Sequence, residues 1–224
     1  MTPAAGPDLT HVETWLFDLD NTLYPSDAGL GAEVDARISA YMVRVTGLPH
    51  AEAYALQKRY LAEHGLTLRG LMLHHGVDPD EFHALFQDMS LEVLARDAKL
   101  VAALERLPGR RLIFTNADAG HASRVLARLG LDHLFEDVFH IGSADFIPKP
   151  SPVTFERLCA AHAITPVRTC FFEDLERNLE PAAALGMTTV LVGEAASGHA
   201  APFVRYRAPN LAAFLSQARL METP

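Results

Sequence analysis

The stretch Val-Glu-Thr-Trp-Leu-Phe-Asp-Leu-Asp-Asn-Thr, residues 12–22, decides the expected fold of this chain. Residues 12–17 are mostly apolar, which is typical of a buried strand, and they run directly into Asp18. Because residues two apart in an extended chain point to the same side, Asp18 and Asp20 can project toward one point. Two carboxylates at this spacing can divide the roles of nucleophile and general acid/base. The stretch therefore predicts a strand that ends in a pair of catalytic carboxylates.

Four more short apolar runs are predicted as strands, at residues 111–114, 138–141, 169–172 and 188–192. Segments with apolar residues at helical spacing separate them. Strands that alternate with helices favour an α/β fold, with a Rossmann-like, mostly parallel sheet that helices cover on both faces. Ligands of such folds bind beyond the carboxyl ends of the strands. The residues that follow each predicted strand are therefore the candidates for a functional site.

Residues 25–97 break the alternation, because they show helical spacing only. Asp78 and Pro79 are typical of a helix start, with a capping side chain and a proline in the first turn. We predict a catalytic core formed by residues 1–24 and 98–224 and an inserted, all-helical cap formed by residues 25–97, set over the strand ends. The alternative is a first crossover made of several helices, with no role over the site.

The composition excludes several classes of protein. The chain has 224 residues, of which 49% are hydrophobic, and a formal net charge of −9, which argues against a large nucleic-acid surface. No apolar run approaches the roughly 18 residues of a membrane span, and the first 14 residues lack the pattern of a signal peptide. Two cysteines, Cys159 and Cys170, cannot form a disulfide framework, so we expect a cytoplasmic protein. The composition does not indicate an oligomeric state.

The other predicted strand ends carry residues suited to phosphoryl transfer. Thr115 follows the second strand, and its hydroxyl can donate to a phosphate oxygen. Lys149 lies between two prolines and can neutralise both a phosphate and a carboxylate nucleophile. Glu173 and Asp174 end the fourth strand and are oxygen ligands of the kind that Mg²⁺ binds. Each has a plain structural alternative, as a cap, a solvated charge or a helix N-terminal pair, but their order along the chain favours a catalytic site.

These motifs, in this order, resemble those of the haloacid dehalogenase superfamily, on its phosphatase side. The residues that carry the resemblance are 17–25, 113–117, 149–150 and 171–178. The resemblance covers the chain from residue 15 to about residue 192. The helical insertion between the first two motifs also matches superfamily members that have a helical cap. The resemblance to this superfamily implies a Mg²⁺-dependent phosphomonoesterase that acts through an aspartyl-phosphate intermediate.

The resemblance also implies a role for each core residue. Asp18 would attack phosphorus, and Asp20 would protonate the leaving oxygen and then activate the hydrolytic water. Mg²⁺ would be held by the Asp18 carboxylate, the Asp20 main-chain carbonyl and the Asp174 carboxylate. Glu173 would act through water or by orienting a ligand, and Asn178 stands where many members have a second acid. The transferring oxygens would be held by Thr115 and Lys149.

Within the superfamily, the chain resembles the pyrimidine 5′-nucleotidase group. The resemblance lies in residues 23–25, 60–71 and 114–117, the last followed by His121. It implies a nucleoside monophosphate as the small-molecule substrate. His64 departs from the pattern, since it stands where the group is expected to have a tyrosine. The candidate substrate-binding residues are Tyr24, Tyr60, His64, Arg69 and Asn116.

Other functions are compatible with parts of this pattern. A phosphatase or phosphomutase for sugar phosphates or other small phosphometabolites would use the same core. A dehalogenase is disfavoured, because expulsion of a halide needs no acid at the position of Asp20. A phosphate-receiver signalling protein is disfavoured by the helical insertion and by Asp20. A non-catalytic binding protein is disfavoured because Asp18 and Asp20 are both present.

Overall fold

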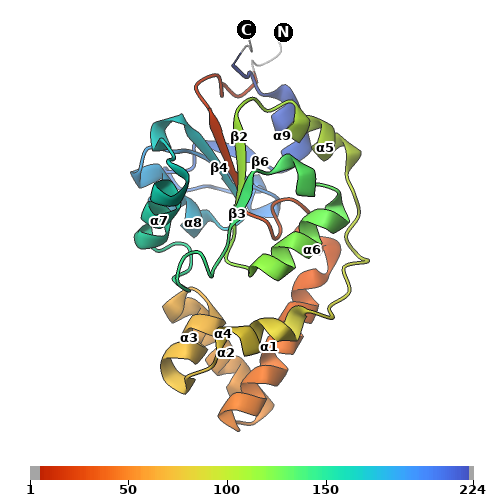
Figure 1. Ribbon diagram of the computed structural model, residues 1–224, viewed down its shortest axis with the longest axis vertical. Coiled ribbons are helices and arrows are strands. Elements are labelled where there is room, and N and C mark those ends of the chain that lie inside the picture. The colour runs from red at the N-terminus through yellow and green to blue at the C-terminus, as the bar shows by residue number, and fades with distance from the viewer. Residues whose placement is uncertain (1–5, 222–224) are drawn as a thin grey trace.

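A six-stranded parallel sheet forms the centre of the molecule. The computed structural model describes residues 6–221. Within them the strands lie in the order β3-β2-β1-β4-β5-β6, and each pairing is parallel. Figure 1 shows the strands in the upper part of the molecule, with helices on both sides. The strands are β1 (Thr14–Phe17), β2 (Arg110–Phe114), β3 (Asp137–Phe139), β4 (Thr169–Glu173), β5 (Thr188–Val192) and β6 (Tyr206–Ala208). The strand order reverses at β1, between β2 and β4, which is where ligands bind in open parallel sheets.

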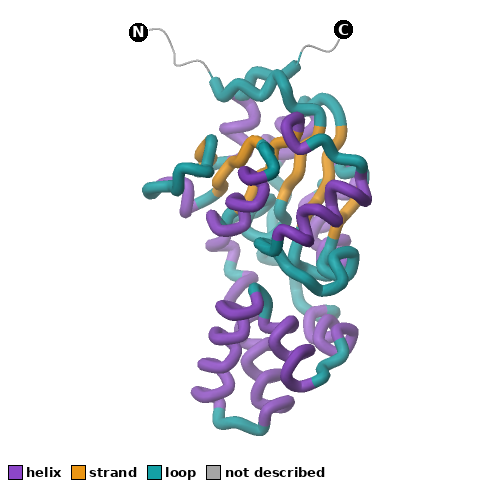
Figure 2. The backbone as a smooth tube through the Cα atoms, turned by 90° about the vertical axis from the view of Figure 1, so that its left-hand side faces the viewer, coloured by secondary structure: helices purple, strands orange, loops and turns teal. Residues whose placement is uncertain are grey.

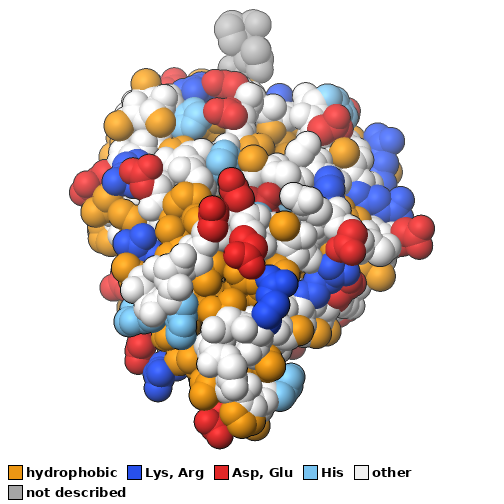
Figure 3. Space-filling view, turned by 60° about the horizontal axis from the view of Figure 1, so that its bottom comes forward, with side chains coloured by type: hydrophobic (Ala, Val, Ile, Leu, Met, Phe, Trp, Pro, Cys, Tyr) orange, Lys and Arg blue, Asp and Glu red, His pale blue; other side chains and the backbone are white. Residues whose placement is uncertain are grey.

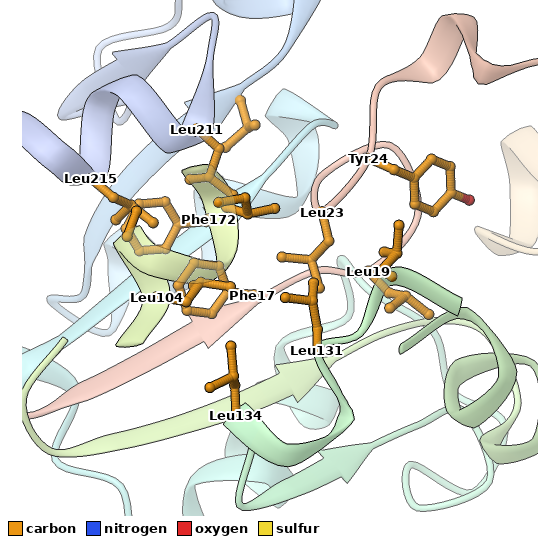
Figure 4. Close-up of a cluster of buried hydrophobic side chains, with 14 of the residues drawn as sticks. Phe17, Leu19, Leu23, Tyr24, Leu104, Leu131, Leu134, Phe172, Leu211 and Leu215 are labelled. Carbon is orange, nitrogen blue, oxygen red and sulfur yellow. The ribbon is translucent and has the colours of Figure 1, made fainter. Parts of the chain in front are cut away.

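Helices cover both faces of the sheet, because its strands are apolar on both sides. Phe17 of β1 faces a core cluster that includes Leu104, as Figure 4 shows. Leu16, the preceding residue, faces the opposite cluster with Phe155 and Leu179. The covering helices are α5 (Ala98–Glu105), α6 (Ala119–Leu129), α7 (Pro152–His162), α8 (Glu176–Ala184) and α9 (Leu211–Gln217). The predicted α/β fold with a covered parallel sheet is confirmed.

A separate helical unit lies between β1 and α5. Its helices are α1 (Leu30–Thr46), α2 (His50–His64), α3 (Thr67–His75) and α4 (Pro79–His83). The unit has a hydrophobic core of its own, which includes Tyr41, Leu71 and Phe82. Figure 2 shows these helices as a block below the strands. The predicted all-helical insertion is therefore confirmed.

One helix of the insertion, α4, begins where the sequence predicts. The Asp78 side chain accepts a hydrogen bond from the Asp80 N–H, and Pro79 occupies the first turn of α4, as the sequence predicts. The division at residues 25–97 stays a prediction. The predicted core ranges, 1–24 and 98–224, extend at both ends beyond the described residues.

Some strand boundaries differ from the predictions. β1 begins at Thr14 rather than at residue 12, although the main chain of Glu13 still bonds to Arg110 of β2 and to Arg168, which directly precedes β4. β3 covers residues 137–139 rather than 138–141, because the chain turns at Ile141, whose N–H donates to the Ala117 carbonyl. β6 and α9 were not among the predicted elements. The Tyr-Arg-Ala sequence of β6 is short and has no apolar run, as suits an edge strand.

The surface is mixed in character. Figure 3, which brings the bottom of Figure 1 forward, shows hydrophobic side chains gathered in the middle of that face, bordered by acidic and basic side chains. Among residues 6–221, no helix is both long enough and apolar enough to cross a membrane.

Candidate active site

The ends of the central strands bring the predicted catalytic residues together. β1 ends at Phe17, and the Asp18 N–H that follows donates to the Phe172 carbonyl of β4 at 2.9 Å. The chain then turns, since the Leu23 N–H donates to the Leu19 carbonyl at 3.0 Å. Leu19 is fully buried in the hydrophobic core, whereas Asp18 and Asp20 line the same cavity. The alternation predicted for this stretch thus places both carboxylates on one side.

Lys149 is the centre of a buried ion cluster. Its Nζ lies 2.7 Å from Asp18 Oδ1 and 2.8 Å from Glu173 Oε2, and it donates to the Phe114 carbonyl at 2.7 Å. Lys149 and Glu173 are each 1% exposed. Burial, followed by the charge of Glu173, raises the pKa of Asp18 to about 7 in spite of the ammonium of Lys149. Two carboxylates thus share one cation here, and a second cation would relieve their repulsion.

Asp20 is held by two donors that bind the same oxygen. Tyr24 donates its hydroxyl to Asp20 Oδ1 at 2.6 Å, and His121 Nε2 lies 2.8 Å from that oxygen. Burial alone would raise the pKa of Asp20, but the hydrogen bond and charge of His121 and the bond from Tyr24 lower it below its ordinary value. Burial would also lower the pKa of His121, but Asp20 raises it. His121 therefore carries a proton toward Asp20, and both donors leave the second oxygen of Asp20 free for other contacts.

His121 was not among the predicted site residues. It lies in the first turn of α6, which Asp118 caps by accepting hydrogen bonds from the His121 N–H. Its side chain is buried and lines the cavity. The sequence feature that could have identified His121 is its position in the first turn of the helix that follows the end of β2.

Three carboxylates form a candidate metal site. One oxygen each from Asp18, Glu173 and Asp174 lies within 4.8 Å of the other two. Burial, followed by the charge of Asp18, raises the pKa of Asp174 to about 6. Asn178 lines the same cavity, and its Oδ1 is buried without a hydrogen-bond partner in the described part of the chain. Hard carboxylate oxygens and an unpaired buried acceptor fit Mg²⁺ and its water ligands.

Thr115 and Asn116 shape the loop that follows β2. The Thr115 hydroxyl accepts a hydrogen bond from the Ala117 N–H at 3.0 Å. The Asn116 side chain accepts from the Lys149 N–H at 2.8 Å and donates to the Lys149 carbonyl at 3.2 Å. Asn116, predicted as a substrate-binding residue, thus clamps the main chain that carries Lys149. Both Thr115 and Asn116 also line the cavity.

The cavity lies between the strand ends and the helical unit and has a volume of about 400 Å³. It is lined by Tyr24, as predicted for a substrate contact. Tyr60, His64 and Arg69 are not among its lining residues. The Tyr60 ring instead lies against Gly70 and stacks on His74, with centroids 5.2 Å apart. The face of α2 that carries Tyr60 thus packs within the helical unit, and contacts of Tyr60, His64 and Arg69 with a substrate stay a prediction.

Comparisons with known proteins identify the family to which this chain is similar. The family model for haloacid dehalogenase-like hydrolases matches residues 12–186. Phosphate metabolism protein 8 of Saccharomyces cerevisiae is 28% identical over 195 residues, which cover 80% of this chain and 61% of that protein. Fructose-1-phosphate phosphatase YqaB of Escherichia coli is 35% identical over 96 residues, which cover 41% of this chain and 49% of that protein. The matched parts are thus 61% and 49% of the curated relatives' lengths.

A solved structure has the same fold over most of this chain. The HAD phosphatase of Thermococcus onnurineus has a TM-score of 0.58 and 16% sequence identity, and the match covers 88% of this chain and 94% of that one. At this level of identity the comparison shows a common fold. The chemistry has to be argued from the site.

Proposed function

This chain belongs to the haloacid dehalogenase-like hydrolases, and on that basis we propose that it is a Mg²⁺-dependent phosphomonoesterase that acts through an aspartyl phosphate on Asp18. The observation that carries the proposal is the pair of carboxylates at the end of β1. Asp18 is paired with Lys149, whereas Asp20 is bound by Tyr24 and His121. Two acids in such different surroundings are suited to two different roles. The proposal includes the division predicted from the sequence, with a catalytic core of residues 1–24 and 98–224 and a cap of residues 25–97. It also includes the predicted cytoplasmic location.

Asp18 is the proposed nucleophile. One of its carboxylate oxygens forms a bond to phosphorus while the bond from phosphorus to the leaving oxygen breaks. Lys149 holds Asp18 in place from one side and, with the Thr115 hydroxyl, lies where it can stabilise the oxygens of the transferring phosphate. Glu173 already binds Lys149 through Oε2 and the Leu175 N–H through Oε1. Its role in the proposal is to orient Lys149.

Asp20 is the proposed general acid and base. Its Oδ1 accepts both hydrogen bonds, so its other oxygen is the one to carry a proton toward the leaving group. The negative charge of a bound phosphate raises the pKa of a neighbouring carboxyl group, which favours the protonated form that the first step needs. After the leaving alcohol departs, the carboxylate accepts a proton from the water that attacks phosphorus and releases Asp18.

Asp18, Asp174 and the main-chain carbonyl of Asp20 would hold Mg²⁺, and Asn178, whose unpartnered Oδ1 lies in the lining of the same cavity, would accept a hydrogen bond from one of its waters. When bound, the ion supplies positive charge that reduces the repulsion between the carboxylate nucleophile and the phosphate. An acid at position 20 is also what separates this site from a dehalogenase, since a halide leaves without a proton.

Replacing Asp20 with asparagine is expected to reduce kcat by roughly 10²–10⁴, the usual contribution of a positioned acid/base. The loss should be smaller for 4-nitrophenyl phosphate than for an alkyl phosphate, because 4-nitrophenolate leaves without much protonation. Steady-state kinetics on the two esters measures this difference. Equal losses on both esters would contradict the acid role. The matched control is Asp132→Asn, which replaces an exposed aspartate of the catalytic core domain.

Nucleoside 5′-monophosphates are the finer candidate substrates. The motif resemblance favours them, and the aromatic side chains of Tyr24, Phe82 and Phe86 line the cavity, where a planar base can pack against them. Sugar phosphates are the alternative, and a phosphomutase would share the same core. All these substrates share the phosphate group, which the core residues bind. Selection among the substrates must therefore come from the cap residues that contact the leaving group.

UMP and CMP are expected to have a kcat/KM at least about tenfold above that of a hexose phosphate, the range that pocket contacts of this kind provide. Arg69→Ala should leave kcat/KM for UMP within about twofold of the parent, because Arg69 lies outside the cavity lining. Phosphate release from a panel of UMP, CMP, AMP and a hexose phosphate tests both statements. A hexose phosphate hydrolysed ten times better than UMP would end the nucleotidase proposal and leave the phosphatase chemistry standing.

A further inference from the structure

The cap contributes a mostly apolar wall to the catalytic cavity. Side chains of α1 and of the segment around α4 provide much of this wall: Leu30, Val34, Ile38, Phe82 and Phe86. Val34, Ile38 and Phe86 are only partly buried, so each has surface left for a bound molecule. The same cavity contains the acids of the reaction centre, so whatever is esterified to the phosphate extends along this wall.

The polar side chains that the cap adds to the cavity are already engaged. Asp35 accepts hydrogen bonds from Gln57 Nε2 at 2.7 Å and from Lys58. Gln57 Oε1 in turn accepts from the Ser39 hydroxyl at 2.8 Å. The Thr67 hydroxyl donates to the Gln57 carbonyl at 3.3 Å. A leaving group with many hydroxyls would therefore find few partners on the cap side, and its desolvated hydroxyls would weaken binding.

His83 is the remaining polar group of the cap wall. It is half-buried and stacks on Phe146, with ring centroids 6.2 Å apart. Burial lowers its pKa below the ordinary value, so its imidazole is neutral at neutral pH. A neutral ring can donate one hydrogen bond and accept one, but it carries no charge that would attract a second anionic group.

The charges around the cavity also disfavour a second anion. Among the described lining residues the lysines and arginines are Lys149 and Arg177, and both belong to the core. Lys149 is paired with two carboxylates. The acids of the lining are Asp18, Asp20, Asp35, Asp118, Glu173 and Asp174. A leaving group that carries its own carboxylate or phosphate would meet these acids and no cation on the cap side, where it would lie, since Arg177 belongs to the core.

We propose that this cavity selects phosphate monoesters whose leaving alcohol is uncharged and places an apolar surface, such as an alkyl chain or the face of a nucleoside base, against the cap wall. This selection assumes the proposed phosphomonoesterase function. The apolar wall binds the leaving group by the hydrophobic effect, while the core residues bind the phosphate. Burial of one methylene corresponds to about a fourfold gain in binding, or ~0.8 kcal/mol. A cavity of about 400 Å³ has room for a leaving group of moderate size.

A series of linear alkyl phosphates tests the proposal. The ethyl, butyl and hexyl esters differ in the length of the alkyl chain, but their leaving alcohols have similar basicity. Differences in kcat/KM within the series therefore report binding of the chain rather than the ease of the chemical step. With saturating Mg²⁺, kcat/KM should rise along the series by about two- to fourfold per methylene. Glucose 6-phosphate and 2-phosphoglycolate should both be at least about tenfold poorer than hexyl phosphate. A kcat/KM that is flat or falls with chain length would overturn the proposal.

The variant Val34→Thr tests whether the apolar wall contributed by the cap binds the leaving group. This substitution keeps the shape of the side chain and adds a hydroxyl to the apolar surface, so the ratio of kcat/KM for hexyl and ethyl phosphate should fall by about fivefold or more. Val43→Thr is the matched control, since Val43 lies on the same helix, is partly buried and does not line the cavity. It should retain the parent ratio. An equal fall in both variants would assign the effect to helix α1 as a whole and contradict the assigned wall.

The proposal and the function it assumes fail in different ways. If no ester, including 4-nitrophenyl phosphate, releases phosphate above the level of Asp18→Asn, the phosphomonoesterase itself is excluded. If the esters are hydrolysed but glucose 6-phosphate or 2-phosphoglycolate is preferred over hexyl phosphate, the phosphomonoesterase stands and the apolar selection is wrong.

Discussion

Replacing Asp18 with asparagine is expected to lower kcat by about 10⁴-fold or more, the scale seen when a catalytic nucleophile is removed. An amide is a poor nucleophile and cannot form the aspartyl phosphate. Asp18 lies at the end of β1 with Lys149 Nζ at 2.7 Å and with the cavity in front of it. Phosphate release under multiple turnover measures the effect, and activity within tenfold of the parent would rule out Asp18 as the nucleophile.

The fold of the Asp18→Asn variant needs its own measurement. Lys149 is buried and would lose one of its two carboxylate partners, while Glu173 remains. Loss of one partner of a buried pair can destabilise a protein, so circular dichroism and thermal unfolding should accompany the kinetics. Asp132→Asn, at an exposed aspartate, controls for the loss of a carboxylate elsewhere in the core.

The parts of the site that follow single strands could be predicted from the sequence. Asp18, Thr115 and Glu173 each lie at the end of an apolar run, and the carboxyl ends of parallel strands meet at one edge of a sheet. Local pattern and this general rule are sufficient to place them together. The stretch of helical spacing between β1 and α5 predicted the insertion in the same way.

The contacts between distant segments could not be predicted in this way. His121 binds Asp20 from 101 residues further along the chain, and no spacing rule connects two such positions. The packing of Tyr60 could not be predicted for a related reason. Helical periodicity identifies it as part of an apolar face, but the face of a cap helix can pack against the cavity or within the cap, and the Tyr60 ring packs on Gly70 and His74. Only the tertiary arrangement decides between the two.

Removal of divalent metal with EDTA is expected to abolish hydrolysis, and added Mg²⁺ should restore it. The physical reason is that three buried carboxylates lie close together and ionise reluctantly. Burial and the charge of a neighbouring carboxylate raise the pKa of Asp18 and Glu173 to about 7 and that of Asp174 to about 6. Lys149 is the cation bonded to this group, and its ammonium already serves Asp18 and Glu173. A dianionic phosphate would add to the repulsion unless a cation is bound.

Asp174→Ala should raise the Mg²⁺ concentration needed for half-maximal activity by at least about 100-fold, since even outer-shell partners of a metal are worth 10–100-fold in affinity. Thermal unfolding provides a readout that does not depend on turnover, because a ligand that binds only the folded state stabilises it, by about 2.7 kcal/mol at 100 times its Kd. Mg²⁺ should therefore raise the Tm of the parent and of Glu180→Ala, an exposed acid of α8, but not that of Asp174→Ala. Hydrolysis at the parent rate in excess EDTA would contradict the proposed metal site, and an equal rise in Tm in all three proteins would show that the ion binds elsewhere.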